Sequence, residues 1–230
     1  MLTLAVDTST QSGSVALLNS DSVLAECLIN VGINHSETLL PAIERILSVA
    51  GTEIAEVDLF ALTVGPGSFT GLRVGVSTVK GLALAADKPV VGVSSIDALA
   101  LNVANSTITI CPMLDARKKE VYTALYRSRR RGMPEKIVGE MIVDPETFLK
   151  GIDEEVIFLG DGAINYCGLI KEILPDKSYF ALSHLQYIKA STVGLLGMNK
   201  FIEGDVLDIM TFIPQYLRLS EAEMKRVAGK

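Results

Sequence analysis

The sequence has few of the residues on which most catalytic and metal sites depend. It has no tryptophan, two histidines and three cysteines among 230 residues. The histidines, His35 and His184, lie far apart without an accompanying acidic or cysteine pattern, so no HExxH site and no Ser-His-Asp spacing can be read. The cysteines, Cys27, Cys111 and Cys167, form no CxxC pair. We therefore expect buried free thiols in a reducing compartment.

Basic charge and long apolar runs are also scarce. The chain has 21 Lys and Arg against 27 Asp and Glu, a net charge of -6. Because phosphate neutralisation supplies much of the affinity for nucleic acid, we do not expect this chain to hold RNA alone. No apolar run of about 18 residues lacks a charge, which predicts no membrane span. The N-terminus lacks the pattern of a signal peptide, so we expect a cytoplasmic protein.

What the sequence does contain is a repeated order of predicted elements. Apolar runs and turn signals in residues 1–105 predict three meandering strands and then two crossover units, in the order βββαβαβα. The same order restarts at Thr107. We therefore predict an α/β protein with two lobes, each with a mixed five-stranded sheet. The predicted boundaries are an N-terminal lobe of residues 1–108, a C-terminal lobe of residues 109–187, and a returning helix and tail in residues 188–230.

Three local patterns refine this order. A helix capped by Asn34, with Glu37 completing a capping box, has one wide apolar stripe and should kink at Pro41. Asp161 is expected to cap a helix that runs to about Leu174. The segment from Pro214 to Arg218 is expected to be extended and docked on the body of the protein.

Two segments of the first half could hold an anion. The turn Asp7-Thr8-Ser9-Thr10 offers backbone amides and hydroxyls, although a hydroxyl-rich hairpin turn explains it equally simply. The second segment runs from Gly65 through Gly67 to Gly75 and leads a glycine-rich turn into a helix. Glycines inside a helix cost about 1 kcal/mol each against alanine. They therefore indicate either phosphate contact or close packing of another helix.

Two turns of the second half are basic. The first is Asp115-Ala-Arg-Lys-Lys-Glu, and the second contains four arginines. Solvated hairpin ends explain both turns, and contact with RNA phosphate or an acidic partner is the alternative. The residues in question are Arg117, Lys118, Lys119, Arg127, Arg129, Arg130 and Arg131.

Several blocks together resemble the bacterial TsaB (YeaZ) family. They are VDTSTQSGSVAL, NHSETLLP, VGPGSFTGLRVGVSTVKGLA, DARKKEVYTALY, GDGA and PQYLR, in that order from residue 2 to about residue 218. The resemblance implies the actin-like ATPase (ASKHA) fold. It also implies a non-catalytic relative and partner of TsaD, the enzyme that transfers threonylcarbamoyl from threonylcarbamoyl-AMP to the adenosine next to the anticodon of tRNA. A TsaE-like ATPase joins them, and tRNA would be bound only within that complex.

At two positions the sequence differs from the motifs of TsaD, and we therefore expect that this chain is not an enzyme. The resemblance places Ser95 and Leu99 where TsaD has an HxxxH metal motif, and these are poor ligands, so we expect no metal. It places Asp115 where TsaD has a Gly-Gly turn that admits phosphates. Binding of ATP or ADP is therefore expected to be weak or shared with a partner. The residues nearest such a nucleotide would be Asp7, Thr8, Ser9, Gly65, Gly67 and Asp115.

The resemblance also implies a partner surface on two neighbouring helices. The same surface would form a homodimer when the partner is absent. The alternative is that both helices pack only on their own sheet. The alternative function is a weak stand-alone ATPase that uses Asp7 and Asp115. A third function, a peptidase, has no recognisable nucleophile or metal set in the sequence to support it. The expected interface residues are His35, Leu39, Leu40, Ile43, Leu47, Gly71, Arg73, Val74, Gly75 and Thr78.

Overall fold

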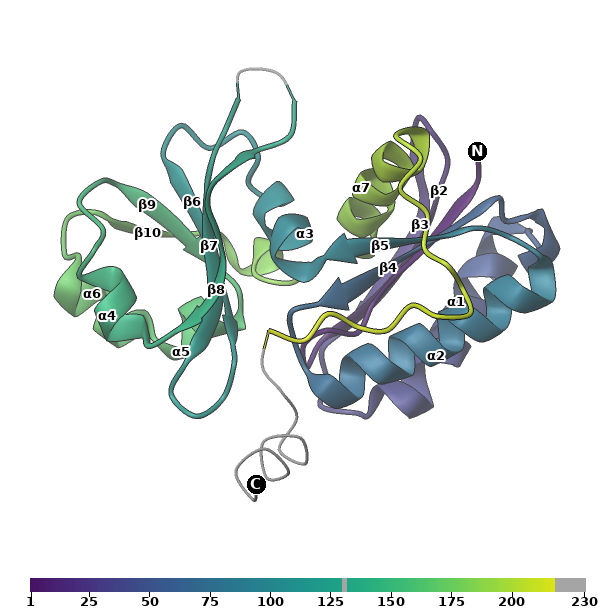
Figure 1. The fold of residues 1–230 in the computed structure, drawn as a ribbon, viewed down its shortest axis with the longest axis horizontal. Coiled ribbons are helices and arrows are strands. Elements are labelled where there is room, and N and C mark those ends of the chain that lie inside the picture. Colours follow the sequence, from purple (N-terminus) through teal and green to yellow (C-terminus); the bar gives the residue numbers. More distant parts are fainter. Residues whose placement is uncertain (130–131, 218–230) are drawn as a thin grey trace.

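The computed structural model describes residues 1–129 and 132–217, which form two five-stranded sheets placed side by side (Figure 1). The first sheet has the order β3-β2-β1-β4-β5 and the second has the order β10-β9-β6-β7-β8. Counted from its antiparallel edge, each sheet contains the third, second, first, fourth and fifth strand of its half. The predicted α/β architecture with a repeated element order is therefore confirmed.

The first sheet is buried at its centre because helices cover both of its faces. Strands β1 and β4 are parallel neighbours and are buried along their whole length. Helices α1 and α2 pack on one face, and α7 returns from the second half of the chain to pack on the other (Figure 1). The elements of this half are β1 (Thr3–Asp7), β2 (Gly13–Leu18), β3 (Val23–Ile29), α1 (His35–Ala50), β4 (Leu59–Gly65), α2 (Phe69–Ala86), β5 (Val90–Ser94) and α3 (Ser95–Leu101).

Both covering helices begin at polar residues, but only one has a side-chain cap. Ser68 Oγ accepts a hydrogen bond from Gly71 N at 3.2 Å at the start of α2. Asn34 is the N-cap of α1, yet its side chain donates to Glu37 Oε1 at 3.1 Å and bonds no helix amide. The predicted capping-box bond from Asn34 is therefore wrong.

The second sheet repeats this arrangement with shorter helices. The predicted helix from Asp161 to about Leu174 is divided at Tyr166, and its N-cap is Gly160, with φ of 106°. The prediction that Asp161 is the cap is therefore wrong. The elements are β6 (Thr109–Asp115), β7 (Val121–Arg127), β8 (Glu135–Val143), α4 (Pro145–Leu149), β9 (Val156–Leu159), α5 (Asp161–Asn165), α6 (Cys167–Ile173), β10 (Ser178–Phe180) and α7 (Ala190–Ile202).

Residues 205–217, here called the C-terminal strap, run back across the first sheet toward the junction of the lobes (Figure 1). Leu207 N donates to Val90 O at 2.8 Å, and Gln215 N donates to Val64 O at 2.7 Å. Pro214 is buried. The predicted docking of this segment is confirmed as far as Leu217, and Arg218 lies outside the described residues.

Two further expectations concern thiols and membranes. All three cysteines are free, but only Cys111 is buried, while Cys27 and Cys167 are partly exposed. The expectation of burial is therefore wrong for these two. Within the two described ranges, no helix is long and apolar enough to span a membrane.

Candidate functional site

A cleft of about 970 Å³ lies where the two lobes and the strap meet. Its first-lobe wall is formed by the turn after β1 and by the N-terminal ends of α1 and α2. Its second-lobe wall is formed by the turn after β6 and by α5. Ser9, Gly67 and Asp115 line this cleft, as a nucleotide contact would require. Asp7, Thr8 and Gly65, the other three candidates, do not.

Asp7 is fully buried beneath the cleft rather than exposed in it. Its Oδ1 atom accepts hydrogen bonds from Ser9 N at 3.0 Å, Ser9 Oγ at 2.6 Å and Thr63 Oγ1 at 2.7 Å. Oδ2 is buried without a hydrogen-bond partner among the described residues. Burial outweighs these bonds and raises the pKa of the Asp7 carboxyl. Asp7 therefore fixes the turn, and a direct nucleotide contact by Asp7 stays a prediction.

Thr8 ties the same turn to α2, which explains the glycines of that helix. Its Oγ1 donates to Gly71 O at 2.8 Å. A Cβ added at Gly71 would overlap the Thr8 carbonyl oxygen, and one added at Gly75 would overlap Thr8 Oγ1. Both glycines are buried. The hypothesis that Gly71 and Gly75 form part of a partner surface is therefore wrong, because the chain's own turn occupies that space.

The glycine-rich turn before α2 is shaped by two other backbone contacts. Ser68 N donates to Ser9 O at 2.7 Å, and a Cβ at Gly67 would overlap that same oxygen. Gly65 has φ of 130°, and a Cβ there would overlap the carbonyl oxygen of Gln215 in the strap. Close backbone packing therefore accounts for both glycines.

The second-lobe wall brings two carboxylates to the cleft. Asp115 Oδ1 accepts a hydrogen bond from Arg117 N at 2.8 Å, and Asn165 Nδ2 donates to Asp115 Oδ2 at 3.2 Å. Asp161 Oδ1 accepts from Asp115 N at 3.0 Å and from Gly162 N at 2.9 Å. Burial raises the pKa of Asp161. These carboxylates share the wall with basic side chains, and Asp115 Oδ2 lies 3.8 Å from Arg117 Nη1.

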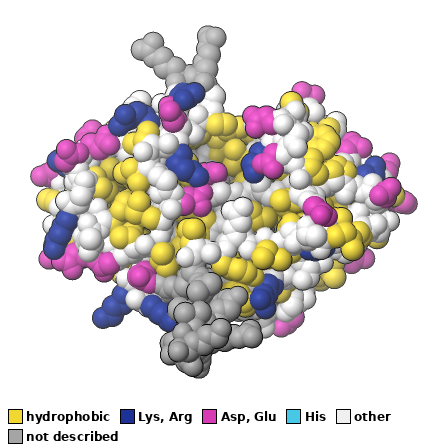
Figure 2. Space-filling model, in the orientation of Figure 1, with side chains coloured by type: hydrophobic (Ala, Val, Ile, Leu, Met, Phe, Trp, Pro, Cys, Tyr) yellow, Lys and Arg dark blue, Asp and Glu magenta, His cyan; other side chains and the backbone are white. Residues whose placement is uncertain are grey.

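The basic residues of the two turns differ in their surroundings. Arg117 and Lys118 line the cleft, while Lys119 is exposed outside it. All three have left-handed backbone conformations, with φ of 61°, 54° and 63°. Arg129 forms an ion pair with Glu135 at 2.8 Å, and Arg130 and Arg131 lie outside the described residues. On the face that it views, Figure 2 shows Lys and Arg among Asp and Glu rather than in a continuous basic area.

The apolar stripe of α1 faces mainly inward. Leu39, Ile43 and Leu47 are 5%, 3% and 9% exposed and pack in the core of the first lobe. The expectation that they contact a partner is therefore wrong, because the sheet beneath them takes up the stripe. Leu40 is 53% exposed, and Val49 on the same helix is 63% exposed. These two positions are nine residues apart, so they flank the buried stripe on opposite sides of the helix.

Helix α2 presents a second outer surface beside α1. Leu84 is 53% exposed, and a Cβ added at Gly81 would meet nothing within 4 Å. Val74 and Thr78 are half-buried. We call Leu40, Ser77, Gly81, Leu84 and Ala85, all of them exposed, the outer helix face. Of these, only Leu40 was predicted by name as an interface residue.

Two predicted interface residues are held by other parts of the chain. His35 is half-buried, with Nε2 2.7 Å from Thr10 O, and it lines the cleft. The Arg73 guanidinium lies 3.9 Å from the centre of the Phe69 ring, and its Nε donates to the Tyr216 hydroxyl at 3.2 Å. The Phe69 and Tyr216 rings are 4.8 Å apart. Sequence analysis missed these aromatic contacts because Tyr216 is remote in the chain.

The positions expected to replace a metal motif lie inside the protein. Ser95 and Leu99 are both 0% exposed. Among the residues that the structure describes, no group of three or more His, Cys, Asp or Glu side chains could hold a metal ion.

Comparison with known proteins identifies the family. The sequence model of the family described as "TsaD: tRNA N6-adenosine threonylcarbamoyltransferase" matches residues 30–226. The tRNA threonylcarbamoyladenosine biosynthesis protein TsaB of Bacillus subtilis is 34% identical over 100% of both chains. The chain belongs to the TsaB (YeaZ) family. The TsaB of Escherichia coli is 31% identical, again over 100% of both chains, so the family covers every residue discussed here.

Solved structures agree with this family and with the fold. YeaZ from Pseudomonas aeruginosa has a TM-score of 0.78 and 29% identity, and covers 94% of this chain and 99% of its own. Component A of the (R)-2-hydroxyglutaryl-CoA dehydratase of Acidaminococcus fermentans has a TM-score of 0.54 at 13% identity, over 87% of this chain and 98% of its own. The second likeness concerns the fold alone. This TsaB-family chain therefore has the actin-like ATPase fold predicted from its sequence.

Proposed function

We propose that this chain is a non-catalytic partner subunit in the formation of tRNA threonylcarbamoyladenosine. Its partner is a TsaD-like enzyme, which transfers threonylcarbamoyl from threonylcarbamoyl-AMP to the adenosine next to the anticodon. A TsaE-like ATPase is the third component, and the complex is cytoplasmic. Family membership supports the pathway, because the named relatives are biosynthesis proteins for this modification.

One contrast within the chain carries the proposal. Asp115 and Asp161 line the cleft, and Asp7 is fully buried. The outer helix face, in contrast, leaves Leu40 and Leu84 about half exposed, at 53% each. Burying such apolar side chains stabilises an interface. Contact of this face with another polypeptide would therefore bury apolar surface and stabilise a complex.

The exposed glycine on α2 supports the same surface. Gly81 costs helix stability of about 1 kcal/mol against alanine, and no neighbour within 4 Å in the chain requires it. A helix of a second polypeptide can approach most closely where side chains are small. The same face would pair two copies of this chain when the enzyme is absent.

The test is binding of the purified chain to its TsaD-like partner, measured by calorimetry. Leu40→Glu places a charge in the proposed contact and is expected to weaken binding at least about ten-fold, or about 1.4 kcal/mol. The matched control is Leu182→Glu, because Leu182 is 67% exposed on the second lobe, away from this face. Equal affinities of the two variants would show that the outer helix face is not the interface.

tRNA is proposed to bind only to the assembled complex. Arg117 and Lys118 line the cleft and Lys119 follows them in the same turn, but the chain as a whole carries a charge of -6. Arg129 is already paired with Glu135. A small basic turn adds to a binding surface completed by a partner more readily than it forms one alone.

The alternative is a weak stand-alone ATPase. Ser9 and Gly67 on the cleft wall favour it, since hydroxyl and backbone groups bind phosphate. Its test is ATP turnover by the isolated chain and by Asp115→Ala. Robust turnover that depends on Asp115 would favour the ATPase over the partner subunit.

A further inference from the structure

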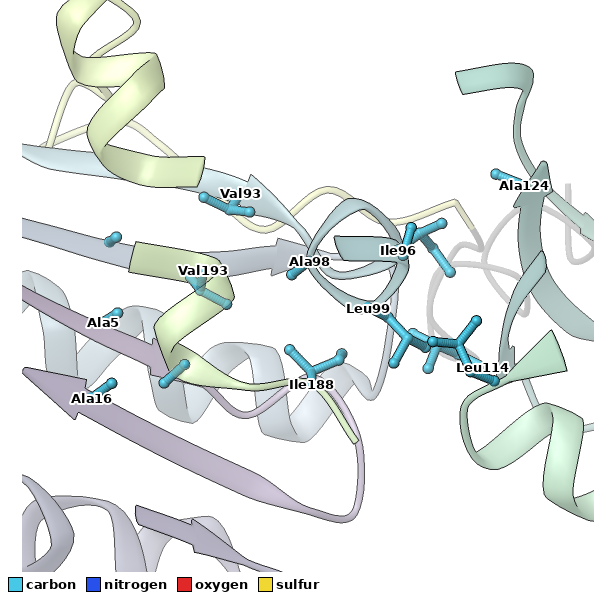
Figure 3. Close-up of a cluster of buried hydrophobic side chains, with 14 of the residues drawn as sticks. Ala5, Ala16, Val93, Ile96, Ala98, Leu99, Leu114, Ala124, Ile188 and Val193 are labelled. Carbon is cyan, nitrogen blue, oxygen red and sulfur yellow. The ribbon is translucent and has the colours of Figure 1, made fainter. Parts of the chain in front are cut away.

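The two lobes share a continuous buried core at their junction. Leu99 of α3 points toward Leu114 of β6, and Ile96 lies beside them (Figure 3). A Cβ added at Gly160 in the second lobe would lie 2.8 Å from Leu99 Cδ2. Helix α3 therefore packs against both lobes. It lies between the two sheets (Figure 1).

A polar cluster crosses the same junction at the edge of this core. Ser94 and Asp97 come from the end of β5 and from α3, on the first-lobe side. Tyr126, Lys136 and Glu140 come from β7 and β8 of the second sheet. Lys136 Nζ lies 2.8 Å from Asp97 Oδ1 and 2.7 Å from Glu140 Oε1. One lysine thus bridges a carboxylate of each side.

Two hydroxyl groups complete the cluster. Ser94 Oγ donates to Glu140 Oε1 at 2.6 Å, and the Tyr126 hydroxyl donates to Asp97 Oδ1 at 2.5 Å. Tyr126 is only 2% exposed. Four charge-assisted bonds therefore join side chains at the junction, and three of the four run directly from one lobe to the other.

The protonation states of the cluster are well defined. Burial, together with the Asp97 charge, raises the pKa of the Tyr126 hydroxyl. Burial alone would lower the pKa of Lys136, but its hydrogen bonds to Asp97 and Glu140 outweigh burial and raise that pKa. The phenol is therefore neutral and the lysine charged near neutral pH, the states in which every bond of the cluster can form.

We propose that Ser94, Asp97, Tyr126, Lys136 and Glu140 form an interlobe latch that fixes the angle between the two sheets. The directional bonds at the rim add to the apolar contacts that already join the lobes. The latch holds the cleft at one width. The cleft walls and the outer helix face then keep a fixed relative orientation, and this does not depend on which partner binds.

The latch is tested by the distribution of distances between the lobes. Spin labels on Ser48→Cys in α1 and Glu172→Cys in α6 report that distance, because both positions are exposed. Cys27 and Cys167 are replaced by serine to avoid additional labelling. Lys136→Met leaves Asp97 and Glu140 without their shared cation. It is expected to broaden the distribution at least about two-fold, because the bonds that oppose lobe motion are lost.

The matched control is Lys150→Met, which removes an i,i+4 pair with Glu146 at 2.6 Å within the second lobe. It should leave the distribution unchanged. A second variant, Tyr126→Phe, keeps the aromatic ring and removes one bond, and should broaden the distribution less than Lys136→Met. If both Lys136→Met and Tyr126→Phe keep the parent width while remaining folded by circular dichroism, the latch is wrong. The measurement uses the isolated chain and is independent of the proposed partner.

Discussion

Glycines of α2 that are alike in sequence differ in what surrounds them. Gly71→Ala would force the Thr8 carbonyl away from the helix, and overpacking of this kind costs about 1–3 kcal/mol. Gly81→Ala meets no neighbour and should stabilise the isolated chain by about 0.5–1 kcal/mol. Urea unfolding of both variants measures the two opposite shifts. Destabilisation by Gly81→Ala as large as that by Gly71→Ala would contradict the assignment.

Asp7 should give the stability of the protein a pH dependence. Its pKa is raised by burial, so the folded protein binds the proton more tightly than the unfolded chain. Between the ordinary Asp pKa and the raised value, stability therefore falls as pH rises. Asp7→Asn should remove this fall because an amide does not titrate. The amide oxygen can still accept hydrogen bonds from Ser9 and Thr63, so the turn is expected to keep its structure. Unfolding free energies from about pH 4 to 7 compare the two slopes, and equal slopes would show that Asp7 has no such role.

At the residue scale, the sequence predicted the chemical character of a segment better than the direction in which its side chains point. The polar turn at Asp7 was recognised, but alternation of side chains along a short turn does not reveal that Asp7 and Thr8 point inward. The helix glycines were recognised as unusual, but their neighbour, Thr8, is more than sixty residues away in sequence. Long-range backbone contacts of this kind have no local signal.

Elements were predicted more reliably, because apolar periodicity reflects burial directly. The order βββαβαβα predicted for the first half is the order that the structure has. The division of the helix after Gly160 was missed, since Tyr166 interrupts it without a glycine or proline. The stripe of α1 was also recognised, but a stripe alone does not distinguish the chain's own sheet from a partner. Burial of Leu39 and exposure of Leu40 make that distinction.

The strap is an element whose docking depends on a few aromatic contacts. Tyr216→Ala removes the ring contact with Phe69 and the bond from Arg73, and should destabilise the docked strap by about 1–2 kcal/mol. Hydrogen exchange at the Gln215 amide, which donates to Val64 O, should therefore accelerate roughly ten-fold or more. Unchanged protection of that amide would mean that Pro214 and the backbone bonds alone hold the strap. Exchange at Leu207 serves as the internal control.

At the scale of the whole molecule, the fold of an ATPase is combined with a cleft that has both acidic and basic side chains on its second-lobe wall. The two sheets and the cleft between them are those of the actin-like fold. Carboxylates occupy one wall, and the residue expected to face a nucleotide is buried. We propose that the outer helix face is the surface through which this chain acts. Loss of activity on damage to that face, but not to the cleft, is therefore the signature of a partner subunit.

The most direct measurement is formation of threonylcarbamoyladenosine by a TsaD-like enzyme supplied with a TsaE-like ATPase, ATP, threonylcarbamoyl-AMP and tRNA. Product should form at the full rate with this chain or with its Asp115→Ala variant. The rate should fall at least about ten-fold with Leu40→Glu or without the chain. A full rate without the chain, or a loss of product with Asp115→Ala while the enzyme remains bound, would contradict the proposed role.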